Sequence, residues 1–454
     1  MNYEQIFNPK TVAIIGATDR AGSVGSGLVK NLLEGAAAGG KKGKDKRKIY
    51  MVNPNQKRVS GISTFPRIGK IKEEIDLAVI AVPAKIVPKI VKECVKKKVK
   101  SIIIISSGFA EIGPKGARLQ KQIQQDINRA NTPLIGPNCL GILRPSTGLN
   151  ASFAPLSPKG GETALISQSG ALLDSIIDAS FGKSHGFSAI ISYGNEAGLT
   201  LPDFLNWAKN DQETKVIALY VEGLKNGRQF FEDSQKAAKR KPIVVLKGGK
   251  SPATKKAVSS HTGALAGEAQ IYSAAFKQAG LIEVQTIEEF LDVSKALAWQ
   301  PKCKNGIGVV TNGGGAGILC ADYCQQFGIK LSSLSTATKT KIDKGVCPNW
   351  SKENPVDIIG DALSNRYKAA INALLEQKDI YGLIVLQTMQ IMTEPIKNAK
   401  IIIEAKKQYP EKPIVTAFLG GKLTQPSIKL LEKNKIPNYP DPHRAVRAMR
   451  SLIK

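Results

Sequence analysis

The sequence predicts an α/β protein built from three successive blocks, each a mainly parallel sheet with helices packed against it. The first observation behind this prediction is a recurring order of short apolar strand, glycine or proline turn and amphipathic helix along the 454 residues. The second is that the apolar runs are nearly continuous in valine and isoleucine, which is typical of strands buried on both faces. The third is that two stretches of the later sequence repeat one another.

The first block, residues 1–145, contains five predicted strands. They are residues 11–16, 49–54, 76–83, 101–108 and 133–139. The segments AKIVPKIVKECVKKKVK and KGARLQKQIQQDINRA lie between strands and have the apolar spacing of helices. Because parallel strands need crossover connections, this alternation indicates a Rossmann-like domain.

The second and third blocks, residues 146–300 and 301–454, begin alike. TALISQSGALL (163–173) and GVVTNGGGAGILC (308–320) are each interpreted as strand, tight turn and helix. Each block later contains a near-identical phrase, KPIVVLKGGK (241–250) and KPIVTAFLGGK (412–422). The common requirements of an α/β fold could produce a strand, a glycine turn and a helix twice. They would not readily produce the KPIV…GGK phrase twice. We infer an internal duplication of a flavodoxin-like unit.

Composition excludes several classes of protein. A hydrophobic fraction of 42% is enough to build cores, so a wholly disordered chain is not expected. No stretch approaches the roughly 20 apolar residues that span a bilayer. The N-terminus MNYEQIFNPKTVAIIGAT has no charged region followed by an apolar core and a cleavage site. We therefore expect a cytoplasmic protein with no membrane partner.

The formal net charge of +28 predicts a lysine-coated, solvated surface. Nucleic acid is not an expected partner, because the lysines are spread along the chain, aromatic residues make up only 6% and no nucleic-acid motif is present. The one dense run, Lys41 to Lys48 (KKGKDKRK), is interpreted as an exposed loop.

The six cysteines do not indicate a metal centre. None forms a CxxC pair, and no matching histidine cluster accompanies them. We expect buried free thiols in a reducing compartment. The cysteines are Cys94, Cys139, Cys303, Cys320, Cys324 and Cys347.

The turn after the first strand, Gly16 to Gly25 (GATDRAGSVG), predicts an anion site. Its glycines let the backbone approach a phosphate, and the helix that follows offers free N–H groups. The second strand ends in Asn53-Pro54-Asn55 and is followed by Lys57 and Arg58, with no carboxylate for the ribose diol of NAD. Lysine and arginine suit a phosphorylated ribose, as in coenzyme A or NADP.

The second and third blocks each carry a further small-residue turn before a helix. They are Ser167-Gln168-Ser169-Gly170-Ala171 and Asn312 to Gly317. Either alone is a weak signal, because glycine turns are common connectors. Two on duplicated units suggest two helix ends that face one phosphate.

His261 is one of three histidines and lies in the small-residue stretch SSHTGALAG (259–267). A neutral imidazole can attack a phosphoryl group, provided that its neighbours are small and a carboxylate fixes the other ring nitrogen. Glu222, at the end of the strand KVIALYVEG, is the candidate carboxylate. Taken alone, His261 is more often a loop histidine bonded to backbone, and Glu222 a surface carboxylate. We expect structural roles for His185 and His443.

Together these residues carry a resemblance to a known family. The chain resembles, over its whole length, the alpha subunit of nucleoside-diphosphate-forming acyl-CoA synthetases (acetate–CoA ligase, ADP-forming), which are related to the succinyl-CoA synthetase alpha subunit. The segments that carry it are GATDRAGSVG, VNPN, AVPA, SSGFAEIG, IGPNCLGI, LISQSGALLD, YVEGLKNGR, SSHTGALAG, TNGGGAGILCAD and NPVDIIGDA. The combination of IGPNCLGI, the SQSGAL turn and SHTGALAG in this order is highly specific.

The resemblance implies a CoA-binding Rossmann-like domain over 1–145 and two flavodoxin-like CoA-ligase domains over 146–300 and 301–454. It implies that His261 is the phosphohistidine and that Glu222 orients it. It implies that Ser169, Gly170, Gly314 and Gly315 bind the phosphoryl group. It further implies that coenzyme A contacts Gly16, Ala17, Thr18, Asn53, Pro54, Lys57, Val82, Pro83, Ser106, Ser107, Gly108 and Asn138, of which Lys57 rests on a loosely aligned loop.

The reaction implied by the resemblance converts acyl-CoA, ADP and inorganic phosphate to free acid, coenzyme A and ATP through an acyl phosphate. No ATP-grasp pattern for Mg-ADP/ATP is found in the three blocks. The resemblance therefore implies a separate beta subunit with that domain, in a complex of two alpha and two beta chains. Two other function classes stay open, a non-catalytic CoA-binding regulatory protein and an NADP-dependent oxidoreductase.

Overall fold

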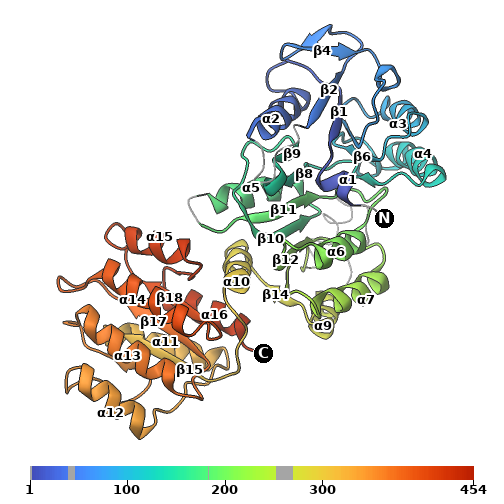
Figure 1. Cartoon of the computed structure of the whole chain (residues 1–454). Coiled ribbons are helices and arrows are strands. Elements are labelled where there is room, and N and C mark those ends of the chain that lie inside the picture. Colours follow the sequence, from blue (N-terminus) through green and yellow to red (C-terminus); the bar gives the residue numbers. More distant parts are fainter. Residues whose placement is uncertain (1–2, 39–46, 182–183, 252–268) are drawn as a thin grey trace. The chain divides into compact units, whose positions relative to one another are not determined.

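The computed structural model describes residues 3–38, 47–181, 184–251 and 269–454 (Figure 1). His261 and most of the lysine run that begins at Lys41 lie outside the described residues. The chain divides into two compact units, Met1–Ile287 and Glu288–Lys454. The first unit contains two sheets and the second contains one.

The first sheet has the strand order β3-β4-β2-β1-β5-β6-β7. Its strands are β1 Thr11–Ile15, β2 Lys48–Val52, β3 Arg58–Val59, β4 Ile62–Phe65, β5 Leu77–Ile80, β6 Ser101–Ile104 and β7 Leu134–Ile135. β2, β1, β5, β6 and β7 are mutually parallel, which confirms the five predicted strands. The β3–β4 hairpin was not predicted; Ser60 and Gly61, both with positive φ, form its two-residue turn.

Helices cover both faces of this sheet, as expected for buried parallel strands. They are α1 Glu4–Phe7, α2 Val24–Ala38, α3 Val87–Lys96 and α4 Pro114–Ala130, with short 3₁₀ turns η1 Ile68–Lys70 and η2 Ala110–Ile112. Val12 and Ile14 of β1 pack in one apolar cluster with α2, whereas Ala13 and Ile15 pack in another with α3 and α4. The alternation follows from the two-residue period of a strand. Figure 1 shows α2 and the α3–α4 pair on opposite sides of the sheet.

The second sheet has the order β14-β13-β12-β10-β11-β8-β9. Its strands are β8 Gly141–Arg144, β9 Leu149–Ser152, β10 Gly160–Ser167, β11 Phe187–Ser192, β12 Val216–Val221, β13 Ile243–Lys247 and β14 Ile282–Val284. Its helices are η3 Pro145–Thr147, α5 Gly170–Ser180, α6 Leu201–Asn210, α7 Gly227–Ala238 and α9 Ala269–Gln278. The β8–β9 hairpin, which was not predicted, joins the sheet antiparallel to β11.

The first two sheets are held together through α2. Asn31 of α2 donates to the carbonyl oxygens of Ser152 and Ala154, both at 2.9 Å. A Cβ atom on Gly35 would lie 2.3 Å from the carbonyl oxygen of Gly148, so α2 approaches the β8–β9 connection at backbone distance. One apolar cluster accordingly runs from α1, β1 and α2 into the second sheet.

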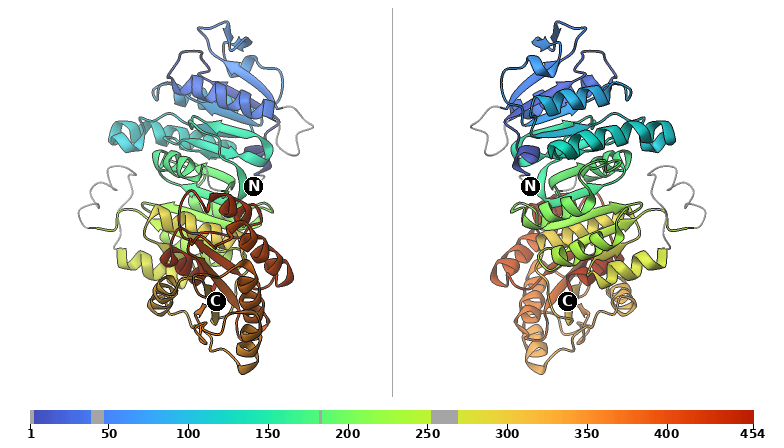
Figure 2. Two further views of the ribbon diagram at one scale, coloured as in Figure 1. Left: turned by 90° about the vertical axis from the view of Figure 1, so that its left-hand side faces the viewer. Right: turned by 90° about the vertical axis from the view of Figure 1, so that its right-hand side faces the viewer.

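The second unit contains a four-stranded parallel sheet with the order β16-β15-β17-β18. Its elements are α10 Ile287–Trp299, β15 Ile307–Thr311, α11 Gly314–Gln326, α12 Thr336–Gly345, β16 Val356–Asp357, α13 Ser364–Glu376, β17 Gly382–Gln387, α14 Pro395–Gln408, β18 Ile414–Phe418, α15 Gln425–Lys433 and α16 Pro442–Leu452. Two further views show helices on both faces of this sheet (Figure 2).

The strand order confirms the predicted duplication. β13-β12-β10-β11 in the first unit and β18-β17-β15-β16 in the second have the same order and are parallel throughout. The repeated phrases begin at equivalent places, since each lysine precedes the fourth strand of its repeat. Lys241 donates to the carbonyl oxygens of Ala208 and Asp211 at the end of α6, and Lys412 donates to those of Leu375 and Gln377 at the end of α13. Each lysine thus satisfies carbonyl groups that a helix end leaves unpaired.

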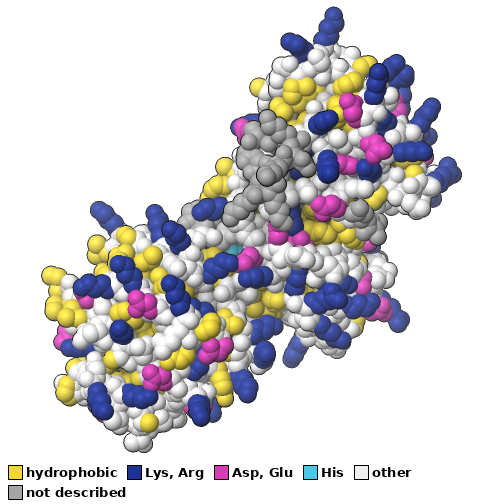
Figure 3. Space-filling view, viewed as in Figure 1, with side chains coloured by type: hydrophobic (Ala, Val, Ile, Leu, Met, Phe, Trp, Pro, Cys, Tyr) yellow, Lys and Arg dark blue, Asp and Glu magenta, His cyan; other side chains and the backbone are white. Residues whose placement is uncertain are grey.

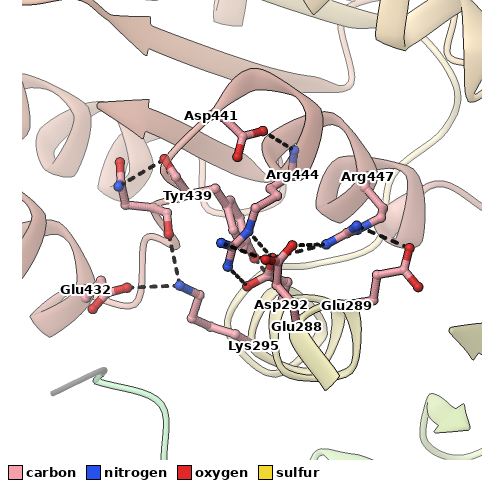
Figure 4. A network of polar contacts seen from close by, with 10 residues as sticks. Glu288, Glu289, Asp292, Lys295, Glu432, Tyr439, Asp441, Arg444 and Arg447 are labelled. Carbon is pink, nitrogen blue, oxygen red and sulfur yellow. Dashed lines mark hydrogen bonds and ion pairs between the residues drawn. The ribbon is translucent and has the colours of Figure 1, made fainter. Parts of the chain in front are cut away.

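An ion-pair network fixes α10 in the second unit (Figure 4). Arg444 of α16 holds the carboxylate of Asp292 with two hydrogen bonds of 2.7 and 2.9 Å. Arg447 contacts Asp292 and both glutamates that precede it on α10. Lys295 donates to Glu432 of α15 at 3.0 Å. α10 therefore packs with α15 and α16 through charged groups as well as apolar ones.

Candidate functional site

The candidate CoA-site residues of the first sheet lie at the carboxyl ends of five neighbouring parallel strands, β2, β1, β5, β6 and β7. After β1 the chain crosses to β2 on one side, and it later returns to β5 on the other. Ligands of doubly wound sheets bind at such a switch point, outside the carboxyl ends. Gly16 follows β1, and Val82 lies two residues after β5.

Gly16 sits where two backbone segments nearly touch. Its φ of +96° is in the left-handed region, and a Cβ atom would lie 2.2 Å from the carbonyl oxygen of Ala81. On its other side, a Cβ atom on Gly25 in the first turn of α2 would lie 2.3 Å from the carbonyl oxygen of Gly16. Only glycine leaves both approaches open. The turn therefore forms a cradle of backbone at the start of α2, which fits a phosphate group.

Hydrogen bonds join the neighbouring loops of this edge. Asn53 donates to the carbonyl oxygen of Ala17 at 2.8 Å. The Ser106 hydroxyl donates to the carbonyl oxygen of Val82 at 2.6 Å and accepts from its N–H at 3.1 Å. Asn138 donates its backbone N–H to the carbonyl oxygen of Ser106 at 2.9 Å. The N–H of Ala81 donates to the carbonyl oxygen of Ile15 at 2.9 Å, so the loops after β2, β1, β5, β6 and β7 are tied into one rim.

The remaining predicted CoA residues occupy the same rim with fewer contacts. Gly108 donates its N–H to Glu111 at 2.5 Å, and Thr18 accepts from the N–H of Arg20 at 3.2 Å. The side chains of Pro54, Lys57, Pro83 and Ser107 are exposed. Lys57 directly precedes the β3–β4 hairpin. Its backbone carbonyl oxygen accepts a hydrogen bond from the N–H of Thr64 in β4 at 3.1 Å.

In the second sheet, the turn Ser167-Gln168-Ser169 connects β10 to α5. The Ser167 hydroxyl donates to the carbonyl oxygen of Ser169 at 2.9 Å and accepts from its N–H at 3.0 Å, which closes the turn on itself. The Ser169 hydroxyl then caps α5 by accepting from the N–H of Leu172 at 3.3 Å. The side chain of Ser169 and the first residue of α5, Gly170, are therefore set at the helix N-terminus, where the helix dipole favours an anion.

Glu222 is buried, with 7% of its surface exposed, although a surface carboxylate is the default for a lone glutamate. The side chain of Gln168 locks the loop that carries it. This amide accepts from the N–H groups of Glu222 and Gly223 at 2.5 and 3.0 Å and donates to the carbonyl oxygen of Gly223 at 2.8 Å. The loop that carries the predicted carboxylate and the predicted anion turn are thus joined by one side chain from the turn itself.

The surroundings of Glu222 are electrostatically perturbed. Burial raises the pKa of Tyr220, and the charge and hydrogen bond of Glu222 raise it further. Burial lowers the pKa of Lys247, an effect that Glu222 opposes, and the Lys247 ammonium donates to the carbonyl oxygen of Glu222 at 2.7 Å. Tyr193 is fully buried, and its hydroxyl has no hydrogen-bond partner among the described residues. Perturbed groups of this kind cluster at functional sites.

The second unit repeats the turn almost atom for atom. The Thr311 hydroxyl donates to the carbonyl oxygen of Gly313 and accepts from its N–H, both at 3.0 Å. The Asn312 side chain accepts from the N–H of Thr388 at 2.8 Å and donates to its carbonyl oxygen at 3.0 Å, in the loop after β17. Gly314 and Gly315 begin α11 and are exposed. Two equivalent helix N-termini, one in each unit, thus carry the four predicted phosphate-binding residues.

Sequence reasoning missed the amides that hold these turns. Gln168 and Asn312 stand inside the quoted turns, and a polar amide directly after a buried strand was the available signal. The two other histidines contact aromatic rings: His185 is buried edge-on to Phe187, and His443 of α16 packs against Tyr323 and Phe327.

The surface carries its positive charge in dispersed form. Lys and Arg side chains are spread over the visible faces of both units, with Asp and Glu between them (Figure 3). Within the ranges that the structure describes, no helix has the length and apolar character needed to cross a membrane. In the same ranges, no three His, Cys, Asp or Glu side chains are grouped so as to hold a metal ion. Five of the six free cysteines are buried and Cys347 is partly exposed.

Comparison with known proteins gives family matches in three successive stretches of the chain. Family models match a CoA binding domain over residues 10–145, a succinyl-CoA ligase like flavodoxin domain over 160–297 and a Ligase-CoA domain over 307–449. The chain is 37% identical to the acetate–CoA ligase (ADP-forming) I subunit alpha of Pyrococcus furiosus, over 100% of this chain and 98% of that protein. It is 38% identical to the acetate–CoA ligase (ADP-forming) I of Archaeoglobus fulgidus over 99% of this chain, but it spans only 63% of that longer protein.

A solved structure gives the same result. The dinucleotide-forming acetyl-coenzyme A synthetase 1 of Ca. Korarchaeum cryptofilum, in complex with phosphate and ADP, matches with a TM-score of 0.92 and 35% identity, over 99% of this chain and 96% of that one. A CoA-binding domain followed by two ligase domains defines the class of CoA ligases. Within that class, the chain belongs to the family of ADP-forming acyl-CoA synthetases, which confirms the resemblance found in the sequence.

Proposed function

We propose that this chain is the alpha subunit of an ADP-forming acyl-CoA synthetase, with acetyl-CoA as the representative substrate. The observation that carries the proposal is the contact of the Gln168 side chain with the backbone N–H groups of Glu222 and Gly223, which ties the loop of a buried carboxylate to the turn that begins α5. A histidine that carries a phosphoryl group needs both features. A carboxylate orients the imidazole, and a helix N-terminus stabilises the transferred anion.

The proposed reaction has three steps. An oxygen of inorganic phosphate attacks the thioester carbonyl carbon of acyl-CoA, the C–S bond breaks, and coenzyme A leaves as its thiolate. An imidazole nitrogen of His261 then attacks the phosphorus of the acyl phosphate, which releases the carboxylate of the free acid. Finally, an oxygen of ADP attacks the phosphohistidine, which yields ATP and regenerates His261.

In this proposal, the site residues have the following roles. Coenzyme A binds the rim formed by Gly16, Ala17, Thr18, Asn53, Val82, Ser106 and Asn138, with Pro54, Lys57, Pro83, Ser107 and Gly108 around it. Ser169 and Gly170 are assigned to phosphoryl binding at the N-terminus of α5, and Gly314 and Gly315 to phosphoryl binding at the N-terminus of α11. Glu222 orients His261.

The partner we propose is a beta subunit that carries an ATP-grasp domain and holds Mg-ADP or Mg-ATP. Two alpha and two beta chains would form the complex, and its location would be cytoplasmic. The support is that a relative of nearly the same length is named as a subunit alpha, whereas a longer relative, of which this chain spans 63%, is named as the ligase itself.

The two other function classes have less support. A regulatory protein that only binds coenzyme A needs neither a buried carboxylate nor the locked turn beside it. An NADP-dependent oxidoreductase needs a single dinucleotide site, and it does not account for the matching turns of β10 and β15.

The complete reaction tests the proposal. The chain, the beta subunit and their mixture are each supplied with acetyl-CoA, Mg-ADP and phosphate, and ATP and free CoA thiol are measured. We expect equal amounts of ATP and CoA from the mixture and none from either chain alone. The same mixture with His261→Ala should form neither product. ATP formation by the His261→Ala mixture would contradict the mechanism.

A binding experiment separates a CoA ligase from an NADP-dependent oxidoreductase. We expect the chain to be retained on immobilised CoA and not on immobilised NADP.

A further inference from the structure

The loop after β11, residues 193–200, belongs to the second domain but runs along the edge of the first sheet. Its N–H groups donate to residues of β7 and the turn that follows it: Asn195 to Pro137 at 2.9 Å, Ala197 to Gly136 at 2.9 Å and Leu199 to Leu134 at 2.7 Å. The contact is close enough to require glycine. A Cβ atom on Gly194 would lie 2.2 Å from the carbonyl oxygen of Pro137. This loop is therefore a direct backbone link between the two domains of the first unit.

Asn195 uses every polar group of its side chain in this link. It is buried, with 6% of its surface exposed. Its amide nitrogen donates to Glu111 at 2.5 Å and to Gln120 at 3.1 Å, and its amide oxygen accepts from Asn138 at 3.3 Å. All three partners belong to the first domain, in η2, in α4 and in the turn after β7.

Glu111 continues the chain of contacts to the rim of the proposed CoA site. Its second carboxylate oxygen accepts from the N–H groups of Gly108 at 2.5 Å and Phe109 at 3.0 Å. Burial would raise the pKa of Glu111, but the hydrogen bonds from Asn195, Gly108 and Phe109 outweigh it and lower the pKa. The charged carboxylate thus fixes the conformation of the loop after β6, in which Ser106 to Gly108 lie.

On the other side, Asn195 is tied to the loop that carries Glu222. The ammonium of Lys225, three residues after Glu222, donates to the backbone carbonyl oxygens of Asn195 at 2.5 Å and Glu196 at 3.2 Å. The opposite end of that loop is held by Gln168. An unbroken series of hydrogen bonds therefore joins the loop after β6 to the loop after β12.

We propose that Asn195 is a positioning residue that sets the loop after β6 at a fixed place relative to the Glu222 loop, through Glu111 on one side and Lys225 on the other. This inference rests on the proposed function, because it assigns Asn195 to the step in which the thioester meets phosphate. Acyl transfer requires the thioester end of coenzyme A, bound by one domain, to lie against the phosphate bound by the other. A displacement of about 1 Å between such groups can lower a rate on the order of 100-fold.

The pair Glu111 and Asn195 allows a test by exchange of donor and acceptor. Glu111→Gln keeps the acceptor for Gly108 and Phe109 but sets an amide donor against the Asn195 amide donor. Asn195→Asp sets a second carboxylate against Glu111. The double variant restores one donor and one acceptor with the same total charge. Asn131→Asp, at the exposed C-cap of α4, is the matched control.

Two half-reactions are measured with the complete alpha–beta complex. The first is acyl-CoA formation from acyl phosphate and coenzyme A, with kcat and the KM for CoA separated. The second is formation of phosphoenzyme from labelled ATP, which needs no coenzyme A. We expect each single variant to lower kcat of the first half-reaction by 10- to 100-fold and phosphoenzyme formation by less than threefold. The double variant should return to within about fivefold of wild type, and Asn131→Asp should match wild type.

Each other outcome is informative. Single variants that lose both half-reactions equally, or a double variant without recovery, would overturn the positioning role and leave the proposed function standing. Unimpaired single variants would overturn it as well. A wild-type complex that forms neither phosphoenzyme nor acyl-CoA would overturn the proposed function and this inference with it.

Discussion

At the scale of single residues, the most informative side chains are two amides that directly follow buried strands. Gln168 and Asn312 each reach across to the loop of the neighbouring strand, 54 to 55 and 76 residues further along the chain. The sequence predicted both turns, because strand, small residues and helix form a local pattern. It could not predict what the amides bind, because their partners become neighbours only when the sheet forms.

Gly16 is the position at which the cradle is most sensitive to an added atom. Gly16→Ala places a Cβ atom 2.2 Å from the carbonyl oxygen of Ala81 in a backbone conformation with φ of +96°. We expect a loss of about 3–5 kcal/mol in the free energy of unfolding, from strain and overpacking together. Gly22→Ala is the control, because Gly22 also has positive φ but nothing lies within 4 Å of its added Cβ. It should cost about 1 kcal/mol. Urea unfolding checks both, and equal costs would contradict the cradle.

Asp174 on α5 predicts a pH-dependent effect on stability. Burial raises the pKa of Asp174 to about 6, and one of its oxygens has no partner among the described residues. A carboxyl whose pKa is higher in the folded state binds more protons there, so its ionisation costs stability as pH rises from about 4 to about 6. Asp174→Asn should therefore match wild type below pH 4 and be more stable above pH 6 by about 1–2 kcal/mol, after allowance for partial exposure. An equal difference at both pH values, in urea unfolding, would contradict this account.

At the scale of elements, the valine- and isoleucine-rich strands could be predicted because each is a local apolar run bounded by turn residues. The β3–β4 and β8–β9 hairpins were missed because strands such as ISTF and LNAS are short and partly polar. They form because longer strands offer an edge to pair with. The repeated KPIV…GGK phrase predicted that the two repeats are equivalent. The sequence did not predict that the lysine of each phrase binds the carbonyl groups at a helix end.

The repeated lysine gives a prediction for the elements it joins. Lys241→Met keeps the length of the side chain but leaves the carbonyl oxygens of Ala208 and Asp211 without their donor. We expect a loss of about 1–3 kcal/mol in the free energy of unfolding of the first unit. Lys412→Met should cost the second unit a similar amount. Lys239→Met, an exposed neighbour, should cost almost nothing. A neutral effect of Lys241→Met in denaturant unfolding would show that the lysine does not stabilise the end of α6.

At the scale of the whole molecule, sequence and structure agree on three α/β blocks in one order. The domain limits 146–300 and 301–454 remain predictions. The second compact unit includes α10, and Arg444 and Arg447 bind acidic residues of this helix from the far end of the chain. Such long-range ion pairs cannot be read from a local pattern. In the sequence, His261 lies between β13, which ends at Lys247, and α9, which begins at Ala269.

In the proposed mechanism, this chain carries a phosphoryl group on His261 between the thioester site and the nucleotide. The most direct measurement mixes the chain with its beta subunit, Mg²⁺ and γ-labelled ATP, and examines the label that each subunit retains. Acid-labile, base-stable label on the wild-type alpha chain, and none on His261→Ala, is the predicted result. Absence of label on the wild-type chain, with a competent beta subunit and CoA still bound, would contradict the claim and leave a protein that only binds coenzyme A.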